Sequence, residues 1–258
     1  IVLFIHRPEQ SVWVNFLMGF FGLGINLFLL GYIHGLMDIR FYRPEFSTIW
    51  KSLKENVLLF LSNLASHISI NGGLIILSFF SAAETLGMYS LAERVIMVLR
   101  LFPALIIQAV FPNASKLYKE DPPAFYKFLK RVYVRVLLVG AVISLGTYLA
   151  APWIIQILSR SNLADSVLFL QLLAAVPFLA SLNVAHVLLL LVADLKSLLF
   201  RASWMMCLYM VIVSAFLTAN YGGVGLCIGI LSTEVIVFLI CLVLLYRHNP
   251  KLIHGFYS

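Results

Sequence analysis

Long apolar runs separated by short polar segments dominate the chain. Each run is nearly free of charge and about 20 residues long, the length an α-helix needs to cross the hydrocarbon core of a membrane. Seven complete spans are predicted, at residues 12–37, 57–80, 86–113, 132–150, 166–192, 202–219 and 224–246. The pattern therefore predicts an all-α fold, a polytopic transmembrane helix bundle with about seven complete helices.

The first residues, IVLFIHRPEQ, resemble the exit of one more apolar helix. They include no initiator methionine, no basic n-region and no small-residue cleavage site, so they do not resemble a signal peptide. We therefore expect the chain to be the C-terminal part of a longer protein.

Composition supports a membrane protein and excludes an ordinary soluble domain. Of the 258 residues, 62% are hydrophobic and only 11% are charged, and the mean hydropathy is +1.00. A soluble domain would carry about twice that share of charged residues. The three cysteines, Cys207, Cys227 and Cys241, fall in apolar spans without ligand-like spacing, and we interpret them as packing residues.

The net charge of +7 comes from basic residues in the connecting segments and predicts topology. Fourteen of the 18 lysines and arginines fall on alternate connections and in the tail. They are Arg40, Arg43, Lys51, Lys54, Lys116, Lys119, Lys127, Lys130, Arg131, Arg135, Lys196, Arg201, Arg247 and Lys251. The other connections hold only Arg7 and Arg160. By the positive-inside rule the crowded side and the C-terminus are cytoplasmic, and no nucleic-acid partner is indicated.

The segment FYRPEFSTIWKSLKEN, residues 41–56, is more polar than its neighbours and interleaves aromatic with basic residues. It fits an amphipathic helix on the cytoplasmic interface that joins two bundles. An ordinary solvated loop with an aromatic anchor is the alternative.

The span SLAERVIMVLRLFPALIIQAVFPNASK, residues 90–116, carries charges that are costly inside a bilayer. On a helical wheel Arg100 lies within about 20° of Glu93, and Gln108 shares that side. Arg94 flanks the stripe at about 100°. Arg100 has no acidic residue three or four positions away, so its partner lies on another helix, in water or on a ligand. An ion pair that only holds the bundle together is the alternative for Glu93.

Polar residues also recur in two other spans. Asn63, His67 and Asn71 follow one another every four residues, and Asn183 and His186 lie about 60° apart downstream of Pro177. We predict that these residues line a cavity together with Arg100, Arg94, Glu93 and Gln108. Glu234 is a single buried carboxylate, for which a structural hydrogen bond is favoured over a proton site.

No enzymatic motif is present in the sequence. It has no metal-ligand spacing of Cys and His, no GxSxG and no phosphate-binding loop, so neither a catalytic residue nor a metal site is predicted. The run YGGVG, residues 221–225, fits a helix connector.

Residues 51–117, KSLKENVLLFLSNLASHISINGGLIILSFFSAAETLGMYSLAERVIMVLRLFPALIIQAVFPNASKL, resemble the start of the C-terminal lobe of the polysaccharide-biosynthesis flippases. These are O-antigen or lipid-linked oligosaccharide transporters of the multidrug/oligosaccharidyl-lipid/polysaccharide exporter superfamily. The segments APWIIQILSRS and LQLLAAVPFLASLNVAHVLLLLVADLK fit the same pattern. The similarity is spread over most of the chain, although its motifs are loose.

The resemblance implies twelve helices in two six-helix lobes around a central cavity. Residues 1–37 would then hold the end of one helix and one complete helix of the first lobe. Residues 38–56 would be the cytoplasmic amphipathic linker, and residues 57–258 the six-helix C-terminal lobe.

The family's function is to flip an oligosaccharide on a polyprenyl pyrophosphate carrier of the undecaprenyl type across the bacterial cytoplasmic membrane. The resemblance implies Arg94 and Arg100 as ligands of the pyrophosphate, with Asn63, His67 and Asn71 bonding sugar hydroxyls. It also implies no cofactor, a candidate coupling to an H⁺ or Na⁺ gradient, contacts with membrane lipids, and a polysaccharide polymerase as a candidate partner.

Three alternatives stay open. One is a cation-coupled multidrug exporter of the same superfamily, which would favour acidic cavity residues. Another is a relative that flips the peptidoglycan precursor. The third, from a different class, is a polytopic membrane glycosyltransferase or acyltransferase, against which the short external connections argue. The sugar repeat, the coupling ion and the oligomeric state cannot be deduced from the sequence.

Overall fold

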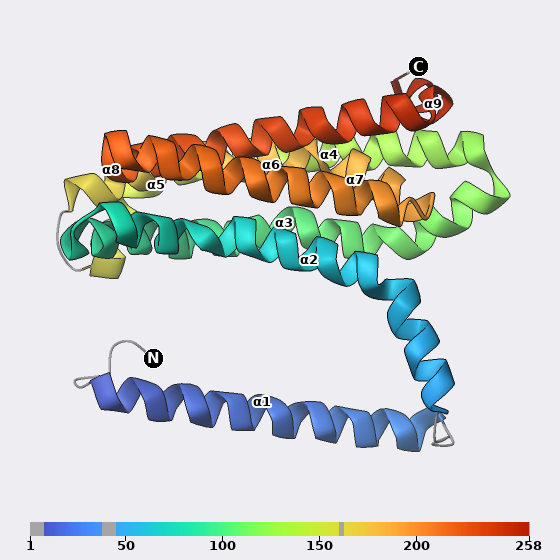
Figure 1. Cartoon of the computed structure of the whole chain (residues 1–258), viewed down its shortest axis with the longest axis horizontal. Coiled ribbons are helices and arrows are strands. Elements are labelled where there is room, and N and C mark those ends of the chain that lie inside the picture. Colours follow the sequence, from blue (N-terminus) through green and yellow to red (C-terminus); the bar gives the residue numbers. More distant parts are fainter. Residues whose placement is uncertain (1–7, 38–44, 160–162, 258) are drawn as a thin grey trace. The chain divides into compact units, whose positions relative to one another are not determined.

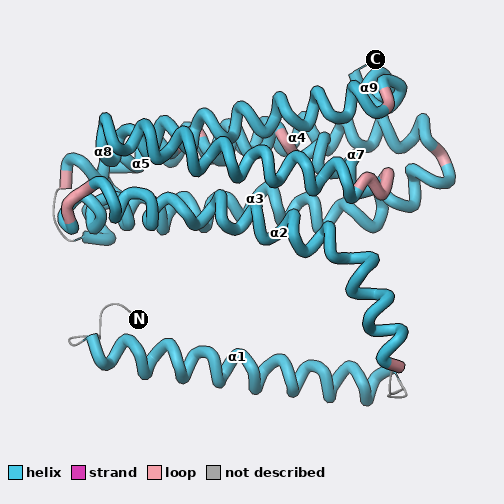
Figure 2. Tube along the Cα trace, in the orientation of Figure 1, coloured by secondary structure: helices cyan, strands magenta, loops and turns pink. Residues whose placement is uncertain are grey.

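The computed structural model describes residues 8–37, 45–159 and 163–257, which form nine α-helices and no strand (Figures 1 and 2). In chain order the helices are α1 Pro8–Met37, α2 Phe46–Phe80, α3 Ala83–Glu120, α4 Pro122–Ser159, α5 Ala164–Leu173, α6 Val176–Leu182, α7 Val184–Val192, α8 Lys196–His248 and α9 Pro250–Tyr257. The all-α prediction is confirmed.

The chain divides into two compact units, residues 1–53 and 54–258. Unit 1 contains α1 and the beginning of α2. The 30 residues of α1 are about 45 Å long at 1.5 Å per residue, which is enough to cross a bilayer. Unit 2 holds the remainder of α2 and all later helices, and every side chain of the site described below belongs to it.

Six helical stretches among the described residues are long and apolar enough to cross a membrane. The longest, α8, contains Gly222 at φ 57° and ψ −138°, a backbone conformation that favours glycine. The chain reverses there, since Gly229 packs against Ser214 from the preceding half. The two halves of α8 therefore correspond to the predicted spans 202–219 and 224–246, and the chain is a multi-pass membrane protein.

The predicted span 166–192 is a helix with two interruptions. It is divided into α5, α6 and α7, with breaks at Ala174–Ala175 and at Asn183. Pro177 stands in the first turn of α6, where its missing N–H removes no helical hydrogen bond. Together these three short helices contact α3, α4 and α8, so the interrupted span forms the centre of unit 2.

Two clusters of buried apolar side chains stabilise unit 2. One includes Phe125, Leu188 and Leu245, and the other includes Tyr89, Phe169 and Leu226. The first lies where α3 meets α4 and α7 meets α8, beside α9, and the second lies where α2 meets α3 and α8 reverses (Figure 1). The cavity described below lies between these two ends.

The described basic residues of the connections gather at the end of unit 2 that holds the first cluster. These are Lys116, Lys119, Lys127, Lys130, Arg131, Arg135, Lys196, Arg201 and Arg247. The alternation of basic connections therefore places these charges at one end of the bundle. Which side of the membrane that end faces stays a prediction.

Part of the predicted domain organisation lies outside the described residues. Residues 1–7, 38–44 and 160–162 belong to that part, and they include four of the basic residues used for the topology prediction, Arg7, Arg40, Arg43 and Arg160. From Phe46 onward the predicted linker is helical and continuous with the following span as a single helix, α2. Its position on a membrane surface stays a prediction.

Candidate functional site

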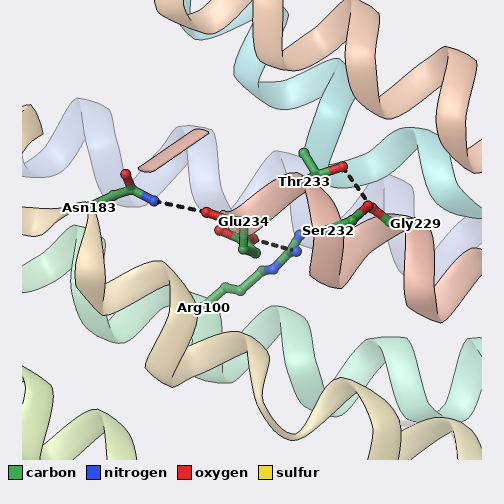
Figure 3. Close-up of polar contacts among 6 residues, drawn as sticks. All are labelled: Arg100, Asn183, Gly229, Ser232, Thr233 and Glu234. Atoms are coloured by element: carbon green, nitrogen blue, oxygen red, sulfur yellow. Dashed lines mark hydrogen bonds and ion pairs between the residues drawn. The ribbon is translucent and has the colours of Figure 1, made fainter. Parts of the chain in front are cut away.

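An ion pair between α3 and the second half of α8 occupies the middle of the helical bundle. Arg100 Nη2 lies 2.7 Å from Glu234 Oε1, and the two side chains are 14% and 16% exposed (Figure 3). Arg100 stands 17 residues after the first residue of α3 and 20 before the last, so it lies near the centre of a helix about 57 Å long. The pair therefore lies near the middle of a predicted membrane span, where an unpaired charge is most costly.

Neighbouring groups fix the Glu234 segment of α8. The Asn183 amide donates a hydrogen bond of 3.4 Å to the backbone carbonyl of Glu234, which joins the break between α6 and α7 to α8 (Figure 3). Ser232 and Thr233 both donate to the carbonyl of Gly229, one turn earlier. Asn183 is buried, and because it caps α6, its amide can reach across to α8.

A cavity of about 490 Å³ adjoins this ion pair. Its polar lining consists of hydroxyl, amide and charged groups from α2, α3, the α6–α7 break and α8. These are Ser62, Asn63, Ser66, Ser69, Arg100, Asn183, Ser203, Thr233 and Glu234. The facing apolar wall includes Met206, Met210 and Leu191. The cavity is of the size that holds a drug-sized ligand or one part of a larger one.

The hydroxyls around the cavity have a common orientation. Ser62, Ser66 and Ser69 each donate to a carbonyl four residues earlier in α2, and Thr233 does the same in α8. A hydroxyl whose proton is used in this way keeps its lone pairs as acceptors. The lining therefore offers acceptors for a hydroxyl-rich ligand, while the Arg100 guanidinium offers donors for an anion.

A second, smaller cavity of about 10 Å³ lies beside the first. Its polar lining is Tyr89, Glu93 and Arg100, all on α3, so Arg100 borders both cavities. Glu93 and Arg100, which the wheel places on one side of α3, both border this cavity, whereas Gln108, on the same side of the wheel, is exposed.

The structure separates the remaining predicted site residues from the cavities. Asn63 and Asn183 line the larger cavity with Arg100. The lining of neither cavity includes Arg94, His67, Asn71 or Gln108, and the side chains of these four are exposed. In the case of Arg94, the position about 100° from the Glu93–Arg100 stripe directs the side chain outward.

His186 is fully buried and packs edge-to-face on Phe238, with ring centroids 5.0 Å apart. It lines neither cavity. The expected alignment of Asn183 with His186 assumed one continuous helix, and the break at Asn183 removes that assumption. The ligand-binding roles of all these residues stay predictions.

The partner of Arg100 that the sequence analysis did not identify is Glu234. The sequence did contain a signal for it, because a mid-span arginine without a local acidic partner requires one elsewhere. The structure supplies that partner 134 positions away. Among the described residues, no group of three or more His, Cys, Asp or Glu side chains could hold a metal ion.

The chain is similar to one family model and to two curated relatives. Residues 1–118 match the family model described as "Polysaccharide biosynthesis protein", a stretch that includes Glu93 and Arg100. The protein named "Putative O-antigen transporter" in Escherichia coli (strain K12) is 26% identical over 207 residues, covering 79% of this chain and 49% of its own length. Its namesake in Shigella dysenteriae is 28% identical over 192 residues, covering 74% of this chain and 48% of that protein.

The chain spans about half the length of the curated relatives it matches. No solved structure matches it. Both relatives carry the name of a transporter rather than of an enzyme.

Proposed function

We propose that this chain takes part in moving a lipid-linked oligosaccharide across the bacterial cytoplasmic membrane. The premise is that it belongs to the polysaccharide biosynthesis and O-antigen flippase family. The observation that carries the proposal is the Arg100–Glu234 pair at mid-helix depth, bordering a cavity of about 490 Å³. In this proposal the pyrophosphate of the lipid carrier binds Arg100 as it crosses the bilayer.

The chemistry of the Arg100 guanidinium supports an anionic ligand. A guanidinium carries five N–H donors in a planar fork that fits phosphate oxygens bidentately. Glu234 occupies one terminal nitrogen, and Nε of Arg100 has no hydrogen-bond partner among the described residues. A phosphate that replaces the carboxylate could therefore engage more donors than the carboxylate does.

The serine-rich lining supports a glycan beside that anion. Sugar hydroxyls are donors as well as acceptors, and the back-bonded serines of α2 present acceptor lone pairs to the cavity. The volume suits a pyrophosphate with one or a few sugars rather than a whole lipid-linked oligosaccharide. The undecaprenyl type of the carrier, coupling to an ion gradient, and contact with a polysaccharide polymerase are parts of the same proposal.

Two arginines on one helix allow a matched test. Arg100→Ala and Arg94→Ala each remove one guanidinium from α3, but only Arg100 borders the cavity. The assay is surface polysaccharide in a strain without its own O-antigen transporter, at equal amounts of membrane-inserted protein. We expect export to fall at least tenfold with Arg100→Ala, the effect of losing one charge-assisted contact of about 1.5 kcal/mol or more, and to persist with Arg94→Ala.

A folding defect in Arg100→Ala could imitate this loss. The double variant Arg100→Met/Glu234→Leu removes the pair without leaving an unpaired charge, so it should fold and still fail to export. Normal export by that folded double variant would contradict the proposal.

A second candidate function, export of cationic drugs, is favoured by one observation. With Arg94 exposed, the described lining of the two cavities contains two carboxylates, Glu93 and Glu234, and one guanidinium. An excess of acidic groups suits a cationic ligand. Drug tolerance that rises with expression and falls with Glu93→Gln, without any change in surface polysaccharide, would favour this candidate.

A further inference from the structure

The carboxylate of Glu93 lies in the interior of unit 2 without a partner. Glu93 is only 6% exposed, and no hydrogen bond or ion pair reaches its carboxylate from the described residues. Tyr89, one turn earlier on α3, is fully buried, and its hydroxyl likewise has no hydrogen-bond partner within the described part of the chain. Two unpartnered oxygen groups thus lie within one helical turn at mid-bundle depth.

Both groups point toward the same place. A Cβ atom added to Gly73 of α2 would lie 3.5 Å from Tyr89 Oη and 3.6 Å from Glu93 Oε1, so the two oxygens converge on the backbone of α2. The small cavity is lined by these two side chains and by Arg100, together with Ile70, Ile96, Met97, Leu173 and Ile230. Its volume of about 10 Å³ is at the lower limit for holding one water molecule, and three polar groups are enough to bind one.

The charges around this cavity do not balance. The one guanidinium, Arg100, pairs directly with Glu234, which leaves Glu93 as a surplus negative charge. From the other elements packed here, α2 contributes Ile70 and Gly73, and α5 contributes Leu173. From α8, Ile230 lines the cavity, Cys227 belongs to the same buried cluster as Tyr89, and Glu234 pairs with Arg100, so α8 supplies no positive charge here. A buried carboxylate without a counter-charge is neutralised rather than kept ionised.

We propose that Glu93 is a proton-binding site, in which its carboxyl group, the Tyr89 hydroxyl and one water molecule share the small cavity. Uptake of the proton forms one O–H bond on the carboxyl group as one O–H bond of a hydronium ion breaks, which leaves a water molecule. Once Glu93 is protonated, the charges of Glu93, Arg100 and Glu234 sum to zero.

The ligand is a proton rather than a metal cation. The cavity offers at most three oxygen atoms, two from Glu93 and one from Tyr89, and five of its eight lining residues are apolar. Hard metal cations take about six oxygen ligands, and the Arg100 guanidinium on the same cavity wall repels a second cation. One proton needs a single acceptor and fits the available volume.

The position of Arg100 between the two cavities gives the proton a role in transport, and this step rests on the proposed function. An anion that binds Arg100 weakens the attraction between the guanidinium and both carboxylates, which favours their protonation. By linkage, protonation of Glu93 favours anion binding to the same degree. The protein therefore takes up protons as the anion binds.

Infrared spectroscopy of the whole 258-residue chain in lipid nanodiscs tests the site directly. A protonated carboxyl group absorbs in a region free of amide bands, and its intensity follows the protonated fraction between mildly acidic and mildly alkaline buffer. We expect this band in the unmodified protein and its loss in Glu93→Gln. It should persist in Glu84→Gln, which changes an exposed glutamate near the start of the same helix. A band that survives Glu93→Gln overturns the proposal.

Two further measurements keep the result decisive if Glu93→Gln folds poorly. Tyr89→Phe removes the neighbouring hydroxyl and should shift the frequency of the band, so an unshifted band would contradict the arrangement. Replacing sodium by choline should leave the band unchanged. If sodium instead abolishes it, and raises the unfolding temperature of the unmodified protein but not of Glu93→Gln, the occupant is a metal cation and the proton site is refuted.

Calorimetry with inorganic pyrophosphate separates this proposal from the proposed function. Titrations in two buffers of different ionisation enthalpy count the protons taken up, with Arg100→Met as the non-binding control. We expect a fraction of a proton to be taken up per pyrophosphate, because Glu93 is already partly protonated without ligand, and less in Glu93→Gln. A Glu93-dependent band without pyrophosphate binding would refute the anion site and leave the proton site intact. Pyrophosphate binding without such a band would do the reverse.

Discussion

Removing either member of the Arg100–Glu234 pair should destabilise the protein far more than removing both. The side chains are 14% and 16% exposed and 2.7 Å apart, so the pair counts as buried. Arg100→Met leaves Glu234 without its cation, and stranding a buried charge in this way costs about 3–5 kcal/mol. Glu234→Gln keeps the shape and leaves Arg100 near Glu93, so the expected cost is smaller, about 1–3 kcal/mol.

The double variant Arg100→Met/Glu234→Leu leaves neither charge unpaired, and its stability should lie within about 1 kcal/mol of the unmodified protein or above it. The two single losses, added together, should therefore exceed the loss in the double variant by about 2 kcal/mol or more. Unfolding in mixed micelles with increasing dodecyl sulfate, followed by the fluorescence of the four tryptophans, measures each free energy. Additive single effects would refute the buried pair, because solvent-screened partners do not couple to this degree.

Further predictions concern the α8 reversal and the topology. Gly229→Ala should cost about 1–3 kcal/mol of unfolding free energy in the same micelle assay, since its Cβ would lie 2.5 Å from Ser214 Oγ. Gly146→Ala in α4, whose Cβ meets nothing within 4 Å, should gain about 0.5–1 kcal/mol, and equal behaviour of the two variants would contradict the tight reversal. A membrane-impermeant thiol reagent added outside intact cells should label Tyr221→Cys but not Lys127→Cys, and the opposite pattern would overturn the predicted orientation.

The helical spans could be predicted from the sequence because bilayer thickness fixes their length. The spans 202–219 and 224–246 were separable for the same reason, and Gly222 supplies the reversal between them. The shared side of Glu93 and Arg100 in α3 was also predictable from a helical wheel, although Gln108, on the same side of that wheel, is exposed. The outward position of Arg94 follows from that wheel as well, although its charge alone suggested a cavity residue.

Other features depend on contacts that no local pattern encodes. The pairing of Arg100 with Glu234 joins residues 134 positions apart, and only the folding of α8 against α3 brings them together. The breaks at Ala174–Ala175 and Asn183 interrupt the span, and His186 beyond them packs against Phe238 and lines neither cavity. The small cavity likewise requires Gly73 of α2 to meet the Glu93 face of α3.

The arrangement of one guanidinium between two carboxylates explains how a membrane protein can keep a mid-span arginine available for a ligand. An unpaired Arg100 would carry a large insertion cost, while an arginine balanced by a single permanent partner would have little reason to release it. Glu234 stabilises the cation in the absence of ligand, and Glu93 supplies a second negative charge that a proton can cancel. In the proposed cycle a phosphate, with more acceptor oxygens and more charge than a carboxylate, displaces Glu234 from Arg100. Proton uptake then removes the repulsion that the two carboxylates would otherwise exert on that phosphate. Ligand exchange on Arg100 and protonation of the neighbouring carboxylates are therefore coupled in a single step.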